Sequence, residues 1–134
     1  MDEKIIALFK TYDSYWNQRN ADAYCGLFTE DASAIFFTLN GEKMEMPSRK
    51  DIHSFYVPRF KDMETRPGVR HNTHITRIQH LNDQVILIDG DAHIAEHQDF
   101  ELTRLRNWAV SFVIIKTTND WHIASLRACE RPIS

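Results

Sequence analysis

The first 18 residues carry the hydrophobic pattern of an amphipathic helix. Their apolar positions recur every three or four residues, at Ile5, Leu8, Phe9, Tyr12, Tyr15 and Trp16. This spacing predicts a helix over residues 2–18 with one aromatic-rich face. Asn20 is a suitable N-cap for a second helix over about 21–28, and Asp22 would lie in its first turn, where the helix dipole favours an anion.

An apolar run at residues 33–39 predicts the first strand. Asn40-Gly41 follows it, and this pair is the strongest two-residue hairpin signal, so we expect a short return strand at about 42–46. Pro47 ends that strand.

A third helix is predicted over about 48–62, with Ser48 as its N-cap. We expect Pro58 to bend or shorten it, because proline has no backbone N–H to donate within a helix. The segment 63–69, which contains Pro67-Gly68, is predicted to be a loop.

Beyond residue 70 the pattern changes to that of strands. Turn residues divide this region into four expected strands, over about 70–81, 84–97, 103–118 and 121–130. Asn82-Asp83 and Asn119-Asp120 predict tight turns, and 98–102 a looser one. Gly90 is a candidate bulge that would bend the sheet. Helices followed by antiparallel strands are typical of an α+β fold with the helices on one face of a curved sheet.

Composition narrows the class of protein. With 134 residues and 43% hydrophobic residues, we expect one globular domain over residues 1–134. The net charge of −3 is spread along the chain, which argues against nucleic-acid binding. No apolar run reaches the roughly 20 residues that cross a membrane. The acidic N-terminus lacks a secretory signal, so Cys25 and Cys129 are expected to be thiols of a cytoplasmic protein.

Three segments resemble the nuclear-transport-factor-2-like superfamily, in particular its SnoaL-like and SgcJ/EcaC-like bacterial branch. YWNQRNADAYCGLFTEDASAIF, from Tyr15 to Phe36, is similar to the family's helix, polar break, "hxxLFxxDA" and first strand. Leu81 to Ala92 is similar to its strand–turn–strand, and Asn119 to Ala124 to its closing "DGxWxI" strand. The resemblance implies a cone-shaped α+β barrel: a strongly curved, mostly antiparallel sheet with three N-terminal helices on its concave face.

The resemblance also implies which faces of the last strands are covered. On the closing strand it places His122, Ala124, Leu126 and Ala128 on the concave side and Trp121, Ile123, Ser125 and Arg127 outside. The strand at 103–118 is apolar on both faces, with Trp108, Val110, Phe112 and Ile114 on one and Ala109, Val113 and Ile115 on the other. We therefore expect a homodimer through the outer sheet face, as is usual in the family.

The catalytic residues of known enzymes in the superfamily can be compared with the matching positions of this sequence. The oxyanion tyrosine of ketosteroid isomerase falls on Tyr12, but its general-base aspartate falls on Phe36 and its second acid at or near Val113. These apolar residues cannot move a proton. The tyrosine–aspartate pair of scytalone dehydratase falls on Trp16-Asn17, which lacks the carboxylate.

Histidine is the remaining acid–base candidate. If the turn after Leu81 has three residues, Ile78 pairs with Ile88 and His74 points into the cone; a two-residue turn would point His71 inward instead. Three residues apart on a strand, these two histidines face opposite sides and cannot share a metal ion. His93 and His97 lie roughly 13 Å apart on a strand and cannot share one either. No metal or other cofactor is therefore predicted.

The leading hypothesis is a pocket for a small, largely hydrophobic or aromatic molecule. Its predicted lining is Tyr12, Trp16, Phe36, Phe55, Phe60, His74 and Leu126. Two alternatives stay open. One is an isomerase, cyclase or dehydratase that uses a pocket histidine as general base, with Tyr12, His71 and His74 as candidates. The other is a dimeric assembly module whose cavity is filled by its own side chains.

Overall fold

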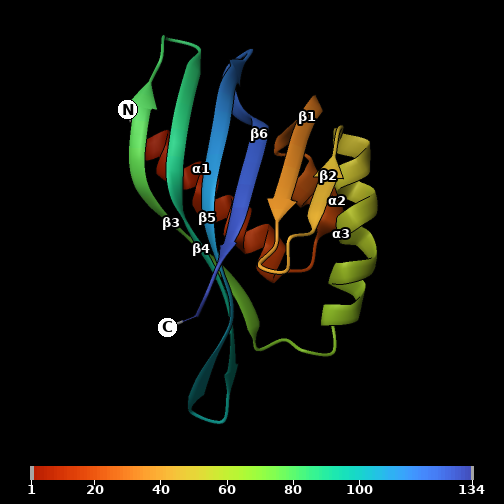
Figure 1. Ribbon diagram of the computed structural model, residues 1–134. Coiled ribbons are helices and arrows are strands. Elements are labelled where there is room, and N and C mark those ends of the chain that lie inside the picture. The colour runs from red at the N-terminus through yellow and green to blue at the C-terminus, as the bar shows by residue number, and fades with distance from the viewer. Residues whose placement is uncertain (1, 134) are drawn as a thin grey trace.

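The computed structural model describes residues 2–133, and within them it contains three helices and six strands (Figure 1). These are α1 (Asp2–Asn17), α2 (Ala21–Cys25), β1 (Phe28–Phe37), β2 (Lys43–Met46), α3 (Arg49–Met63), β3 (Val69–His80), β4 (Val85–Gln98), β5 (Glu101–Thr117) and β6 (Asp120–Arg131). The strands form one sheet in the order β2-β1-β6-β5-β4-β3. Every pairing is antiparallel except that of β1 with β6.

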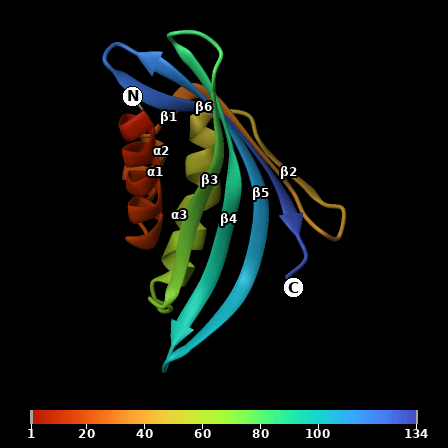
Figure 2. The same cartoon turned by 90° about the vertical axis from the view of Figure 1, so that its left-hand side faces the viewer.

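The sheet is curved and open, with β2 and β3 at its edges, and the helices cover its concave side (Figure 2). The predicted α+β class is confirmed. Ile5, Phe9, Tyr12 and Trp16 of α1 are buried, and the Phe9 ring packs edge-on against Phe112 of β5 with centroids 4.7 Å apart. Burying each such side chain contributes about 1.5–3 kcal/mol, so the aromatic face of α1 determines where the helix docks. None of the described helices is long and apolar enough to cross a membrane.

The helices begin where the sequence predicts. The Asn20 side chain accepts a hydrogen bond from the Ala23 amide at 3.0 Å, and Ser48 caps α3 in the same way. Of the two effects expected of Pro58, a bend or a shortening, the shortening is wrong, because α3 continues to Met63. Ile52, Tyr56 and Phe60 are buried on both sides of the proline, and their packing holds the helix together.

The turn between β4 and β5 also differs from its prediction. Instead of a loose segment at 98–102, only Asp99 and Phe100 separate the two strands. Both have positive φ, 50° and 69°, as in the type I′ turn that matches the twist of a hairpin. The resulting hairpin projects beyond the rest of the molecule (Figure 1).

The bulge expected at Gly90 lies on the opposite strand. The pairing steps from Ile75–Gly90 to Arg77–Asp89, so Thr76 of β3 is the extra residue. Gly90 permits the close approach, since a Cβ there would lie 2.4 Å from the carbonyl oxygen of His74.

A second bulge corrects the predicted faces of β6. Val113 pairs with Ser125 and Ile114 with Ile123, which leaves Ala124 as the extra residue. Beyond the bulge the prediction holds, because Leu126 and Ala128 are buried on the concave side. Before it the faces are reversed: Ile123 is fully buried, whereas His122 and Ala124 are only half-buried.

Candidate functional site

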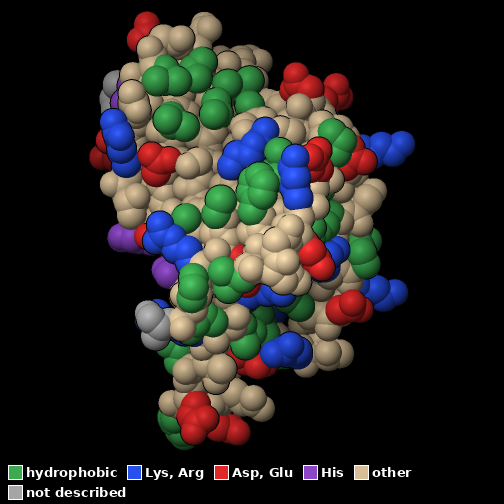
Figure 3. Space-filling view, viewed as in Figure 1, with side chains coloured by type: hydrophobic (Ala, Val, Ile, Leu, Met, Phe, Trp, Pro, Cys, Tyr) green, Lys and Arg blue, Asp and Glu red, His purple; other side chains and the backbone are tan. Residues whose placement is uncertain are grey.

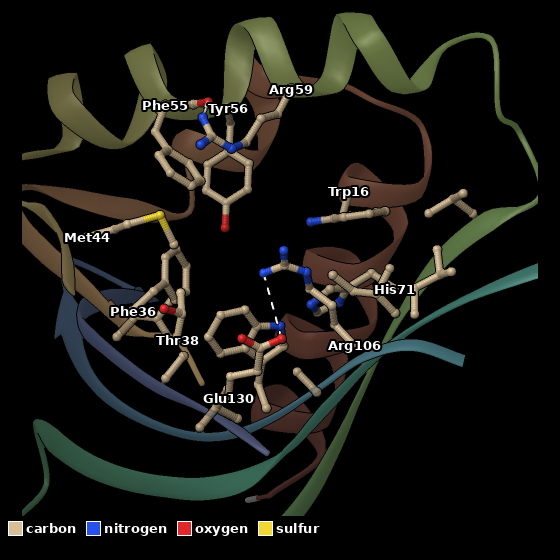
Figure 4. Close-up of a pocket in the computed structure, with 18 of the residues that line it drawn as sticks. Trp16, Phe36, Thr38, Met44, Phe55, Tyr56, Arg59, His71, Arg106 and Glu130 are labelled. Carbon is tan, nitrogen blue, oxygen red and sulfur yellow. Dashed lines mark hydrogen bonds and ion pairs between the residues drawn. The ribbon is translucent and has the colours of Figure 1, made fainter. Parts of the chain in front are cut away.

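A cavity of about 750 Å³ lies between the concave face of the sheet and helices α1 and α3. Its apolar walls come from Tyr12, Trp16, Phe36, Met44, Phe55, Trp108, Val110 and Leu126. Its polar lining includes Tyr56, Arg59, His71, Arg106 and Glu130 (Figure 4). Such an arrangement, mostly apolar with a few polar groups, is typical of small-molecule sites.

Most of the residues predicted to line a pocket lie on this cavity wall. They are Tyr12, Trp16, Phe36, Phe55 and Leu126, joined by His71. Phe60 does not line the cavity: its ring packs behind Trp16 and Tyr24, with centroids 5.6 and 5.8 Å away. His74 does not line it either, because it is exposed on the outer side of β3.

The Thr76 bulge explains why His71, and not His74, faces the cavity. Ile78 pairs with Ile88, which is the register that was expected to turn His74 inward. The extra residue at Thr76 reverses the two faces of the strand between Ile78 and His74. His71 is consequently 8% exposed and contributes to the cavity wall.

His71 is held by a carboxylate from α1. Its Nδ1 lies 2.8 Å from Oδ1 of Asp13. Asp13 also accepts hydrogen bonds from the backbone amide and the hydroxyl of Thr73, each at 2.8 Å. Because a carboxylate can only accept, Asp13 fixes the ring hydrogen of the neutral His71 imidazole on Nδ1, which leaves Nε2 as an acceptor.

The sequence pattern did not reveal Asp13 as a site residue. Asp13 lies beside the apolar face of α1 and one turn before Asn17, which bonds both the amide and the carbonyl of His71, at 2.7 and 3.1 Å. Arg19 adds a bond to the carbonyl of Val69 at 2.7 Å. The i, i+4 spacing of Asp13 and Asn17 was the available signal: two polar residues flanking the buried stripe, placed to reach one neighbouring strand.

Two ring nitrogens are directed at open space in the cavity. Within residues 2–133, every buried side-chain nitrogen has a hydrogen-bond partner, whereas Nε2 of His71 and Nε1 of Trp16 have none. Both nitrogens are therefore accessible, and both residues line the cavity. The two rings are stacked at a tilt, with centroids 5.0 Å apart. The cavity thus offers one acceptor and one donor on the same wall.

Three tyrosines, one from each helix, meet beside the cavity. The hydroxyl of Tyr24 donates to that of Tyr12 at 2.6 Å, and the ring of Tyr56 lies 4.7 Å from that of Tyr24. Burial raises the pKa of Tyr12 and of Tyr24 well above its usual value, and raises the pKa of Tyr56 to about 12. All three phenols are neutral at physiological pH, and the Tyr56 hydroxyl points into the cavity as a donor (Figure 4).

Residues 2–133 contain no group of three or more His, Cys, Asp or Glu side chains arranged to hold a metal ion. The polar groups on the cavity wall are instead suited to proton transfer and to hydrogen bonding.

Comparison with known proteins agrees with this architecture. A crystal structure of a domain of unknown function with a cystatin-like fold from Nostoc punctiforme superimposes with a TM-score of 0.75 at 22% identity, covering 98% of this chain and 78% of that one. An NTF-2 like protein of unknown function from Shewanella oneidensis gives 0.74 at 17% identity, covering 95% and 97%. A putative calcium/calmodulin dependent protein kinase II association domain from Xanthomonas campestris gives 0.73 at 17%, covering 100% and 90%.

Because the sequence identities are low, these structural likenesses establish the fold alone. No curated protein sequence matches the chain. The family model for the SnoaL-like domain matches residues 5–128, from the first turn of α1 to the inward-facing Ala128 of β6. The protein therefore belongs to the SnoaL-like domain family.

Proposed function

We propose that the protein binds a small, largely hydrophobic or aromatic molecule in the cavity and moves a proton on it with His71. The observation that carries this proposal is the Asp13–His71 pair, with its 2.8 Å contact and a free Nε2 on the cavity wall. A histidine whose second nitrogen is fixed by a partly buried carboxylate is the arrangement expected of a general base.

The chemistry follows from the groups present. Nε2 of His71 takes a proton from an acidic C–H or O–H of the bound molecule, and Asp13 stabilises the imidazolium that forms. The neutral Tyr56 phenol donates a hydrogen bond to the oxygen on which negative charge develops. The imidazolium then returns the proton to another carbon, which is an isomerisation, or to a departing hydroxyl, which is a dehydration.

This base differs from that of ketosteroid isomerase. The position matching its aspartate is Phe36, which packs between Phe55 and Trp108 with centroids 5.8 and 5.4 Å away. That position contributes apolar surface to the cavity and no proton acceptor. The proposed proton transfer therefore depends on α1 and β3 instead of β1.

The proposal is tested with a substrate found by screening ring-bearing compounds with acidic protons. His71→Gln should lower kcat by about 10²–10⁴-fold while leaving binding within a few fold, and Asp13→Asn should lower kcat while changing its pH profile. His74→Gln is the matched control, since it removes a histidine from the same strand on the outer face. Unchanged turnover by His71→Gln would show that the base is wrongly assigned.

Binding without turnover is the second candidate, and the large apolar cavity wall favours it. Isothermal titration calorimetry of the same compounds against wild type and Trp16→Ala tests the binding that both candidates require. We expect Trp16→Ala to weaken affinity at least tenfold, because it removes a ring and a donor from the wall. If no compound binds to the wild type, both candidates are wrong.

We also propose a homodimer through the outer face of the sheet. Val85, Leu87, Val113 and Ile115 are half-buried there, and apolar side chains gather over the upper part of this face (Figure 3). A protein described as a putative association domain has the same fold, and this likeness supports the proposal that the present protein also assembles.

A further inference from the structure

A row of aromatic rings in the cavity has a guanidinium at each end. The rings are Phe55, Phe36 and Trp108, with successive centroids 5.8 and 5.4 Å apart. The guanidinium carbon of Arg59 lies 3.5 Å from the Phe55 centroid, and that of Arg106 lies 5.9 Å from the Trp108 centroid. All five residues line the cavity, so an apolar surface is bounded by two cations from different walls.

Arg106 is a charged residue on the concave face of β5. It pairs in register with Ile94 of β4 and occupies the same concave face as the buried Trp108. Its one ion pair is long, 3.8 Å from Nη1 to Oε2 of Glu130, and it makes no hydrogen bond to residues 2–133 (Figure 4). A guanidinium carries five N–H donors in a planar fork, so most of those of Arg106 are available to a ligand.

Glu130, the ion-pair partner of Arg106, is held more firmly than Arg106 itself. Glu130 accepts a hydrogen bond from the Leu39 amide at 3.1 Å, and its side chain is only 15% exposed, against 51% for Arg106. Arg59 donates to the Phe55 carbonyl at 3.0 Å and has no ion-pair partner within residues 2–133. Glu130 thus holds the Arg106 guanidinium at the cavity without occupying its donors.

The surrounding charges select the kind of anion. Glu42, Asp62 and Arg66 also line the cavity, and Arg66 is already paired with Glu96 at 2.7 Å. Three carboxylates, counting Glu130, oppose a ligand with two negative charges. One planar carboxylate, however, matches the guanidinium fork and needs only one unit of positive charge.

We propose that the ligand is an aromatic or apolar monocarboxylic acid, its carboxylate bound by Arg106 and its ring against Phe36 and Trp108. This inference rests on the proposed function, since it names the ligand class of the same cavity. Anchoring the carboxylate orients the rest of the molecule within the cavity that His71 and Tyr56 line.

The experiment compares each acid with its neutral amide by isothermal titration calorimetry, using indole-3-acetate with indole-3-acetamide and 2-naphthoate with 2-naphthamide. We expect the acid to bind at least tenfold more tightly, the size expected for hydrogen bonds to a charged group. Arg106→Gln should remove this preference. Glu130→Gln, which keeps the acceptor for Leu39 but removes the competing charge, should strengthen it several-fold. Arg104→Gln, on the outer face of the same strand, is the control and should leave it unchanged.

These outcomes distinguish the carboxylate proposal from the binding proposal on which it rests. If acid and amide bind equally and Trp16→Ala weakens both, the carboxylate proposal is wrong and the binding proposal stands. A preference that survives Arg106→Gln, or a phenyl phosphate that binds as tightly as the carboxylates, likewise overturns the proposed recognition. If neither member of any pair binds, both proposals are wrong.

Discussion

At the scale of single residues, Asp13 has two roles. It orients His71, and it also accepts a hydrogen bond from the Thr73 amide along the free edge of β3. Neither contact is visible in the sequence, because the partners lie 58 and 60 residues away along the chain. What the local pattern shows is a polar residue beside a buried stripe, which is also the description of an ordinary solvent-facing aspartate.

Tyr56 gives a prediction about pH at the same scale. Burial raises its pKa to about 12 from the ordinary value of 10.0, so the folded state keeps the phenol proton longer than the unfolded chain does. The stabilisation is complete below pH 10 and is lost as the pH rises towards 12. Two pKa units correspond to roughly 2–3 kcal/mol in the free energy of unfolding.

Urea unfolding at pH 9 and at pH 11.5 measures this loss, which Tyr56→Phe should reduce. Tyr15, on the half-buried side of α1, provides the control variant Tyr15→Phe. An equal loss of stability in wild type and Tyr56→Phe would contradict the assignment.

At the scale of elements, the β4–β5 hairpin carries an identifiable strain. Phe100 has a φ of 69° and is fully exposed, so its side chain gains no packing in return. Phe100→Gly should therefore raise the free energy of unfolding by about 0.5–1 kcal/mol. Phe100→Ala removes the same ring without relieving the backbone and should give no comparable gain. Thermal unfolding of the two variants side by side checks the prediction; equal stabilities would show that the turn is not strained.

The elements themselves were largely predictable, whereas the faces of their side chains were not. The aromatic spacing of α1 and the caps Asn20 and Ser48 are local signals, and each of these features forms as expected. The hairpin after β1 also forms, but its predicted two-residue turn is wrong: Thr38 pairs with Glu42 across three residues, and of Asn40 and Gly41 only Gly41 has a positive φ. The bulge at Thr76 has no such signal, because it arises from the pairing of two strands. Since one extra residue exchanges the two faces, the sequence could name two histidines but not the one that faces the cavity.

At the scale of the whole molecule, the outer sheet face gives a prediction about assembly. Val113 lies there at a half-buried position beside Ser125. A charge introduced at the centre of an apolar contact costs several kcal/mol, so Val113→Asp should convert a dimer to a monomer. Sedimentation at several concentrations measures the change, with Gln79→Asp on the exposed edge strand as the control. A wild-type protein that is monomeric at every concentration would contradict the proposed dimer.

The contacts from Asn17, Asp13 and Arg19 to the backbone of β3 have a consequence for how this protein tolerates change. An uncovered strand border can recruit further chains into a growing sheet, and here the border is shielded by the same carboxylate that holds the histidine. The proposed proton transfer and the protection of this strand edge therefore depend on one short segment, residues 13–19. Variants that lose Asp13 should therefore also aggregate more readily, because the edge of β3 would be less protected.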